Sequence, residues 1–325
     1  MLQDRFGRVH DYLRLSLVDK CNLRCTYCMP ENIRFLPNKH LLSDEELFAF
    51  AETFVEMGVK KIRFTGGEPL LRRNAGAIME RIARLPVQLA LTTNGILLHE
   101  FTDLFGEIGL RNINVSLDTL QTERFAEITR RDQFQQVREN IERAGRAGFH
   151  LKINVVVTRG VNEDELLDFV ALTASERIHV RFIEFMPFDG NRWKWDQVCS
   201  YREMMARIED RYTVKKLQDG PNSTAKAYRV SGFAGTFAVI SSVTQPFCGT
   251  CNRIRLTADG KLRNCLFATQ ETDLLTPFRA GEDIRPRIVE AIRGKAKELG
   301  GLPAFQDESA LQQKLDGRAM VKIGG

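Results

Sequence analysis

At 325 residues, with 43% hydrophobic and 27% charged side chains, the chain is long enough for one large domain and a smaller one, or for two of similar size. No apolar run approaches the length that spans a bilayer, and residues 1–5 lack the apolar core of a secretion signal, so we expect a cytoplasmic protein without a membrane segment. The net charge of +5 is mild and no long basic run is present, so a nucleic-acid groove is not required.

Six alternations of strand and helix are predicted before residue 187. The first strand covers Tyr12–Leu17, where three leucines occupy one face and polar residues the other. Ser43–Glu46 is a capping box that begins a helix reaching about Met57. The further strands are Lys60–Thr65, Val87–Thr92, Arg111–Ser116, Lys152–Val157 and His179–Phe185, and the further helices cover about 74–84, 100–107, 118–145 and 163–173. Short joints and intervening helices predict a parallel sheet, with functional residues at the carboxyl ends of its strands.

The pattern changes after Met186. Residues 188–193 form a polar connector that contains glycine, and a helix is predicted over Tyr201–Arg211. Short alternating strands near 213–217, 227–230 and 236–241 are typical of antiparallel pairing. We therefore place the domain change roughly between residues 190 and 235. The predicted division is a barrel over 1–190 and a smaller α+β region over 191–325.

Three thiols lie within eight residues and form what we call the first thiol set, Cys21, Cys25 and Cys28. Three close thiols without a fourth indicate an iron–sulfur cluster with one open iron, because a closed zinc site would use four ligands. Two alternatives stay open at this point. A zinc loop could recruit His10 or His40, or the three thiols could be unrelated and partly buried.

A second thiol set comprises Cys248, Cys251 and Cys265. Its spacing does not separate zinc with a recruited ligand from an iron–sulfur cluster. Arg253 and Arg255 lie between these thiols, and in an extended strand they share one face, where two guanidinium groups suit phosphate oxygens. The alternative is an ordinary solvated strand. The remaining thiol, at position 199, stands alone before a helix and is interpreted as a packing residue.

Other unusual residues follow the predicted strands. Gly66-Gly67-Glu68-Pro69 allows a sharp turn and close approach of a ligand, although strand-to-helix turns use the same residues. Five cations are candidates for the interior of the barrel, and together they would balance the charge of a triphosphate. They are Arg14, Arg63, Lys152, Arg253 and Arg255.

The first thiol set, with Tyr27 directly before its third cysteine, resembles the radical S-adenosylmethionine (SAM) superfamily. The resemblance implies a partial (β/α)6 barrel in which the open iron of a [4Fe-4S] cluster chelates SAM. The electron of the cluster then splits SAM into methionine and a 5′-deoxyadenosyl radical. The residues implied to contact SAM are Tyr27, Gly67 in the glycine-rich turn, Ser116 and Met186, whereas Thr92 is implied to contact the substrate.

A narrower resemblance covers nearly the whole chain. Phe6-Gly7-Arg8, Phe185-Met186-Pro187, the stretch 247–253, Cys265-Leu266-Phe267 and the final Gly324-Gly325 resemble the GTP 3′,8-cyclase family, which begins molybdenum-cofactor biosynthesis. This implies that the radical takes the 3′ hydrogen of GTP, and that C3′ then attacks C8. The product is (8S)-3′,8-cyclo-7,8-dihydroguanosine 5′-triphosphate. A second [4Fe-4S] cluster on the second thiol set is implied to bind the guanine edge, and Gly324 and Gly325 to enter the active site.

The resemblance also implies partners, and two alternative functions stay open. The implied partners are GTP, an electron donor and the downstream cyclic pyranopterin monophosphate synthase, with neither nucleic acid nor membrane. The oligomeric state is left open, with a homodimer as one option. One rival is a radical SAM enzyme that modifies a peptide and carries an auxiliary cluster. The other is a non-catalytic metal-binding regulator.

Overall fold

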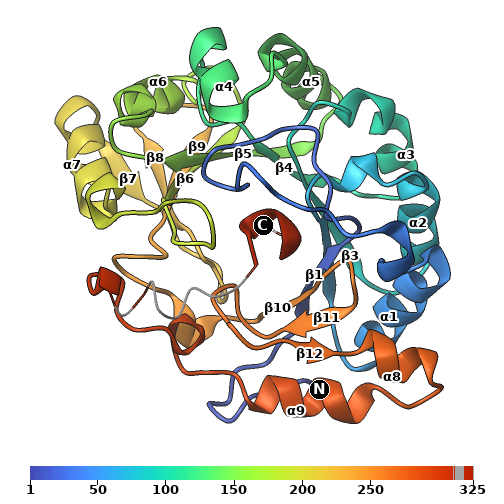
Figure 1. Cartoon of the computed structure of the whole chain (residues 1–325). Coiled ribbons are helices and arrows are strands. Elements are labelled where there is room, and N and C mark those ends of the chain that lie inside the picture. The colour runs from blue at the N-terminus through green and yellow to red at the C-terminus, as the bar shows by residue number, and fades with distance from the viewer. Residues whose placement is uncertain (310, 312–317, 325) are drawn as a thin grey trace.

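The computed structural model describes residues 1–309, 311 and 318–324. Within these residues, the strands form one sheet in the order β12-β11-β10-β1-β2-β3-β4-β5-β6-β9-β8-β7. The strands are β1 Tyr12–Ser16, β2 Lys61–Thr65, β3 Gln88–Thr93, β4 Asn112–Ser116, β5 His150–Val157, β6 His179–Glu184, β7 Val214–Lys216, β8 Lys226–Val230, β9 Thr236–Ile240, β10 Arg253–Leu256, β11 Lys261–Arg263 and β12 Thr272–Asp273. The sheet curves around a central space, and the C-terminal end of the chain lies near its middle (Figure 1).

The neighbours among β1 to β6 pair in parallel and in chain order, which confirms the predicted partial (β/α)6 barrel. Helices α1 to α7 surround the sheet (Figure 1). The helices are α1 Asp44–Glu56, α2 Ala75–Ile82, α3 Thr102–Glu107, α4 Thr122–Thr129, α5 Phe134–Arg146, α6 Leu166–Ala171, α7 Tyr201–Arg211, α8 Leu275–Arg279 and α9 Arg285–Arg293. None of those in the described part of the chain is long and apolar enough to cross a bilayer.

Strands from the C-terminal half extend both edges of the barrel sheet. β7, β8 and β9 pair antiparallel with one another, as predicted, but β9 also pairs in parallel with β6. At the other edge β10 pairs in parallel with β1, so that Tyr12 lies beside Arg253. The sheet therefore continues across the predicted division at residue 190, and that division remains a proposal.

The barrel strands alternate between an apolar outer face and a polar inner face, as the two-residue period of a strand requires. The outer residues pack with the helices and are fully buried; they include Leu13, Leu15, Ile62, Phe64, Leu91, Ile113, Val115, Val180 and Phe182. The intervening residues point to the inside of the curved sheet. Because the core lies outside the sheet, the inside is left free for polar side chains.

The capping box that begins α1 forms as predicted. The backbone N–H of Glu46 donates to Ser43 Oγ at 3.1 Å, and the N–H of Ser43 donates to the Glu46 carboxylate at 2.7 Å. We expect Ser43→Ala to lower the free energy of unfolding by about 1 kcal/mol, because an orphan amide loses its acceptor. Denaturant unfolding would measure this, with the exposed Ser231→Ala as control. An equal loss in both variants would contradict the capping role.

Candidate active site

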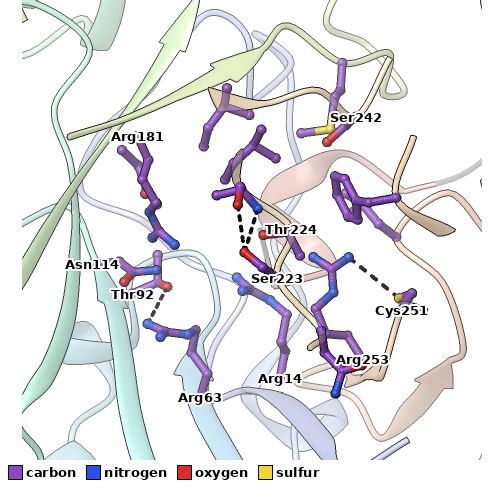
Figure 2. A pocket seen from close by; sticks show the side chains of 18 of the residues that line it. Arg14, Arg63, Thr92, Asn114, Arg181, Ser223, Thr224, Ser242, Cys251 and Arg253 are labelled. Carbon is purple, nitrogen blue, oxygen red and sulfur yellow. Dashed lines mark hydrogen bonds between the residues drawn. The ribbon is translucent and has the colours of Figure 1, made fainter. Parts of the chain in front are cut away.

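A cavity of about 490 Å³ lies inside the curved sheet. It is lined by the inward residues of β1 to β6, β9 and β10 and by the segment between β7 and β8. Figure 2 shows Arg14, Arg63, Arg181 and Arg253 arranged around this space. Its volume is in the range of small-molecule binding sites.

All five cations proposed from the sequence line this cavity, and two further cations, Lys61 and Arg181, lie with them. Only two carboxylates, Asp118 and Asp219, belong to the described lining. Burial and then the neighbouring Arg63 lower the pKa of Arg181 to about 9, and burial and Arg181 lower that of Lys152 to about 8. These cations repel one another electrostatically, so a polyanion bound among them would be stabilised.

The register of three neighbouring strands explains part of this clustering. Arg14 on β1 lies beside Arg255 on β10 and beside Arg63 on β2. Adjacent strands lie about 4.8 Å apart, so the Cα atoms of the three arginines form a short row across the sheet.

Tyr12 lies among these cations. The Nε of Arg63 donates to Tyr12 Oη at 2.5 Å, and Lys61 lies over the ring, 5.1 Å from its centroid. Burial raises the pKa of Tyr12, but Arg63 and Arg14 outweigh it and lower this pKa to about 7. The cations around Tyr12 therefore favour the phenolate form of its side chain.

We expect a pH titration of tyrosinate absorbance in the free protein to show one step near 7 instead of near 10, because the cations stabilise the phenolate. Tyr12→Phe should remove this step, and Arg63→Gln should move it to higher pH. Tyr212→Phe serves as the control and should keep it. A titration curve for Tyr12→Phe that matches the parent would contradict the assignment.

The first thiol set follows β1, and its three cysteines are free. Burial raises the pKa of each thiol, and the neighbouring thiols raise those of Cys25 and Cys28 further. Among the described residues, no three His, Cys, Asp or Glu side chains are spaced to hold a single metal ion. Three thiols of this kind could hold an iron–sulfur cluster, in which each thiolate binds a different iron.

The histidines considered as fourth ligands lie elsewhere. His10 is fully buried, with its Nε2 3.1 Å from Asp4 Oδ2, and His40 is exposed in the 3-10 turn Asn38–His40. The arrangement therefore gives no support to zinc held by either ring. Cys199 is fully buried in the hydrophobic core, as predicted.

The glycine-rich turn holds the start of the first thiol set by close backbone contact. The N–H of Gly67 donates to Val18 O at 2.7 Å, and the N–H of Glu68 donates to Lys20 O at 2.8 Å. A Cβ atom on Gly67 would lie 2.2 Å from Lys20 O. Gly67 is not among the described residues that line the cavity. Its observed role is to let these two loops approach each other.

Glu68 joins this turn to the next strand end. Its buried carboxylate accepts from Thr93 Oγ1 at 2.8 Å and from the Asn94 backbone N–H at 2.7 Å, and burial raises its pKa to about 7. The Asn94 side chain donates to Asn22 Oδ1 at 2.6 Å and lies 3.7 Å from Cys21 Sγ. The ends of β2 and β3 therefore fix the position of the first thiol set.

The other residues assigned to SAM and to the substrate are brought to the cavity. Tyr27, Thr92, Ser116 and Met186 all line it. The Oη of Tyr27 donates to Asp118 Oδ2 at 2.8 Å, which links the thiol loop to the end of β4. The connector after β6 also contributes, since Asn191 Nδ2 donates to Met186 O at 2.9 Å.

The second thiol set lines the same cavity. Cys251 Sγ lies 3.6 Å from Arg253 Nη2 and 3.6 Å from Lys295 Nζ, and the N–H of Leu299 donates to Cys248 Sγ at 3.4 Å. Burial raises the pKa of Cys251, but Arg253 and Lys295 outweigh it and lower this pKa to about 6. Thiolate is the form of cysteine that binds metals, so this environment fits a metal centre.

The C-terminal tail reaches the arginines of the cavity. Gly324 O accepts from Arg14 Nε at 3.2 Å and from Arg255 Nη1. Gly324 has a φ of 72°, and a Cβ there would lie 2.6 Å from Thr65 Oγ1. Only glycine therefore fits this position without movement of its neighbours. Gly325 lies outside the described residues.

Several residues of the site were not identified from the sequence: Tyr12, Lys61, Asn114, Asn154, His179 and Arg181. Each lies on the inner face of a predicted strand, so the strand alternation could have identified them. Three of their atoms, Asn114 Oδ1, Asn154 Oδ1 and Arg181 Nε, are buried without a hydrogen-bond partner among the described residues. Buried polar groups without partners are costly, so these atoms fit a site that holds a polar ligand.

Comparison with known proteins agrees with this geometry. Residues 15–173 match the model of the radical SAM superfamily, and residues 178–300 match the model described as Molybdenum Cofactor Synthesis C. GTP 3′,8-cyclase of Listeria monocytogenes is 38% identical in an alignment that covers 100% of this chain and 99% of the relative. The chain belongs to the GTP 3′,8-cyclase family.

Other members of the GTP 3′,8-cyclase family differ in length. The mitochondrial GTP 3′,8-cyclase of Arabidopsis thaliana is 42% identical, over 100% of this chain and 84% of the relative. Molybdenum cofactor biosynthesis protein 1 of mouse is 48% identical over 91% of this chain but only 48% of its own length, so the chain spans about half of that relative. The radical SAM part of the family implies a [4Fe-4S] cluster and SAM.

A solved structure supports the fold. Streptococcus suis SuiB bound to its precursor peptide SuiA has a TM-score of 0.61, covering 89% of this chain and 67% of that chain, at 15% identity. At this identity the likeness concerns the fold alone, and it agrees with the predicted partial barrel.

Proposed function

We propose that this chain is a radical SAM GTP 3′,8-cyclase, which converts GTP to (8S)-3′,8-cyclo-7,8-dihydroguanosine 5′-triphosphate. The observation that carries the proposal is the meeting of the cations of the cavity, the second thiol set and Gly324 at one site. The cations suit a triphosphate, and a thiol set beside them offers a metal to the guanine. Family membership adds independent support.

Cys21, Cys25 and Cys28 would hold the [4Fe-4S] cluster of the radical SAM barrel. When bound, this cluster supplies the electron that cleaves SAM to methionine and a 5′-deoxyadenosyl radical. We assign the positioning of SAM to Tyr27, Gly67, Ser116 and Met186. We propose that Gly67 affects the position of SAM only indirectly, because it packs against the backbone of residue 20.

Arg14, Arg63, Lys152, Arg253 and Arg255 would bind the triphosphate of GTP, with Thr92 beside the sugar. These residues would hold GTP so that the hydrogen atom on C3′ could pass to the 5′-deoxyadenosyl radical, giving 5′-deoxyadenosine. The bond between C3′ and C8 of guanine would then form, and one electron from an external reductant with one proton would complete the product. This chemistry requires that water and other hydrogen donors be kept away from the radical while it reacts.

Cys248, Cys251 and Cys265 would hold a second [4Fe-4S] cluster that binds the guanine edge. Zinc remains the competitor for this site, and iron and sulfide content decides between them. Two clusters require about eight iron atoms per chain after anaerobic reconstitution, and one cluster with zinc requires about four.

The wider setting is proposed on family grounds. A cyclic pyranopterin monophosphate synthase would consume the product, an electron donor would reduce the clusters, and the location would be a reducing cytoplasm. We retain the division into a barrel over 1–190 and a second unit over 191–325. The two matched family models meet between residues 173 and 178, close to this point.

Anaerobic incubation with SAM, GTP and a strong reductant tests the proposal. The expected products are 5′-deoxyadenosine and the cyclised nucleotide in step with each other. A peptide-modifying enzyme would cleave SAM but leave GTP unchanged. A metal-binding regulator would leave both SAM and GTP unchanged. The Cys265→Ser variant should still cleave SAM but lose affinity for GTP, because only the second thiol set is changed.

A further inference from the structure

Lys295, just after α9, is a buried cation in contact with the second thiol set. Lys295 is only 2% exposed to solvent. Its Nζ lies 3.6 Å from Cys251 Sγ, 3.0 Å from Arg253 O and 3.4 Å from His10 Nδ1. Lys295 is not among the described residues that line the cavity, so it reaches the thiol from behind the site.

No carboxylate in the described part of the chain forms an ion pair with Lys295. The nearest acid in its network is Asp4, which pairs with Arg8 at 2.6 Å and with His10 at 3.1 Å. Asp4 pairs with Arg8, and only the His10 ring joins it to Lys295, so the ammonium group has no carboxylate partner in the described contacts. Lysines are almost never fully buried unless they are paired, because desolvation of the ammonium is costly. Among the described hydrogen-bond partners of Lys295, the group that can become an anion is the Cys251 thiol, and Cys265 of the same thiol set also acts on Lys295 electrostatically.

The position of Lys295 is fixed by the N-terminal segment. Arg8 Nη1 donates to Cys248 O and to Lys297 O, both at 2.8 Å, and Arg8 Nη2 donates to Ala296 O at 2.8 Å. One guanidinium group thus holds the thiol loop and the backbone after Lys295 together. The approach of Nζ to Cys251 is consequently built into the backbone and does not depend on a free surface side chain.

We propose that Lys295 is the built-in counter-ion of the second metal site, where its ammonium group hydrogen-bonds the Cys251 thiolate and raises the reduction potential of the bound iron–sulfur cluster. This inference rests on the second cluster of the proposed function. Net charge and hydrogen bonds to sulfur set the potentials of such clusters. A nearby positive charge favours the reduced form, which is more negative by one electron. Lys295 is thus a positioning and tuning residue, and it does not touch the substrate.

The test is a redox titration of the full-length, reconstituted protein, followed by electron paramagnetic resonance. In Lys295→Met, we expect one of the two cluster potentials to shift to a more negative value while the other stays unchanged. Lys295→Arg keeps the charge, so the potential of that cluster should stay close to the parent value. Lys297→Met is the matched control, since Lys297 is exposed two residues away and should leave both potentials unchanged.

Thermal unfolding of the metal-free protein separates tuning from a purely structural role. In the described contacts Lys295 meets a thiol, a backbone carbonyl and a histidine ring but no carboxylate, and desolvation of such a buried ammonium group opposes folding. We therefore expect metal-free Lys295→Met to unfold at the same temperature as the parent or higher. A lower unfolding temperature with both potentials unchanged would make Lys295 structural and overturn the proposal.

Iron content distinguishes failure of this inference from failure of the proposed function. About eight iron atoms per chain in parent and variant, with identical potentials, would overturn only the role of Lys295. About four iron atoms plus zinc in the parent would overturn the second cluster, and the counter-ion role with it. Full iron content and a negative shift in Lys295→Met alone would support both.

Discussion

The double variant Arg253→Ala, Arg255→Ala is expected to bind GTP about 100-fold more weakly than the parent, or weaker still, with little change for guanosine. A hydrogen bond to a charged group contributes about 1.5–3 kcal/mol, and two such side chains would be lost from the phosphates. Arg253 and Arg255 both line the cavity, beside Tyr12 and Arg14 of β1. Anaerobic calorimetry with GTP, GDP and guanosine would measure the effect.

Two controls make this prediction specific. Arg229→Ala removes an exposed arginine from β8 and should leave GTP affinity unchanged. Arg255 also donates to the tail at Gly324 O, and Arg253 Nη2 lies 3.6 Å from Cys251 Sγ, so iron content is measured in each single variant to separate the phosphate effect from a change in the tail or the second thiol set. Equal losses for GTP and guanosine would contradict a role in binding phosphate.

The second large effect is expected for Gly67→Ala, which should destabilise the fold and impair iron binding by the first thiol set. The new Cβ would lie 2.2 Å from Lys20 O and 2.5 Å from Lys20 C, so backbone must move. Overpacking of this kind costs about 1–3 kcal/mol or more. The displaced segment leads directly into Cys21, so cluster assembly should fail before overall folding does.

Thermal unfolding and iron content after reconstitution measure the two parts of this prediction. Gly106→Ala is the matched control, because a Cβ at this position of α3 meets nothing within 4 Å. Glycine inside a helix is unfavourable, so this control should be neutral or stabilise by up to about 1 kcal/mol. Full iron content in Gly67→Ala would show that the turn does not need to approach the thiol loop so closely.

Local patterns allowed the barrel strands and most helices to be predicted. Apolar residues at every second position mark the buried face of the barrel strands, and Tyr201–Arg211 matches α7 at both ends. The pairing of β10 with β1 and of β9 with β6 was not predicted, because it joins segments far apart in sequence and no local period encodes it. Helices α8 and α9 were also not predicted from the sequence.

The site was predictable where motifs carry the chemistry. The six cysteines and five cations were all proposed from their spacing or from family resemblance, and the cavity gathers all five cations and the second thiol set. Arg181 and Lys61 were overlooked because they stand in ordinary strands without a motif. Lys295 could not be found at all, since its contact with Cys251 depends on the tertiary path of the chain after α9.

The pairing of β1 with β10 has a consequence for how the protein is made. Tyr12 is synthesised 241 residues (253 minus 12) before its partner Arg253. Until then one edge of β1 exposes unpaired amide and carbonyl groups, which invite wrong pairing with other chains. Distant contacts of this kind also slow folding, because a long loop must close first. We therefore expect the nascent chain to depend on protection of that edge until β10 has been synthesised.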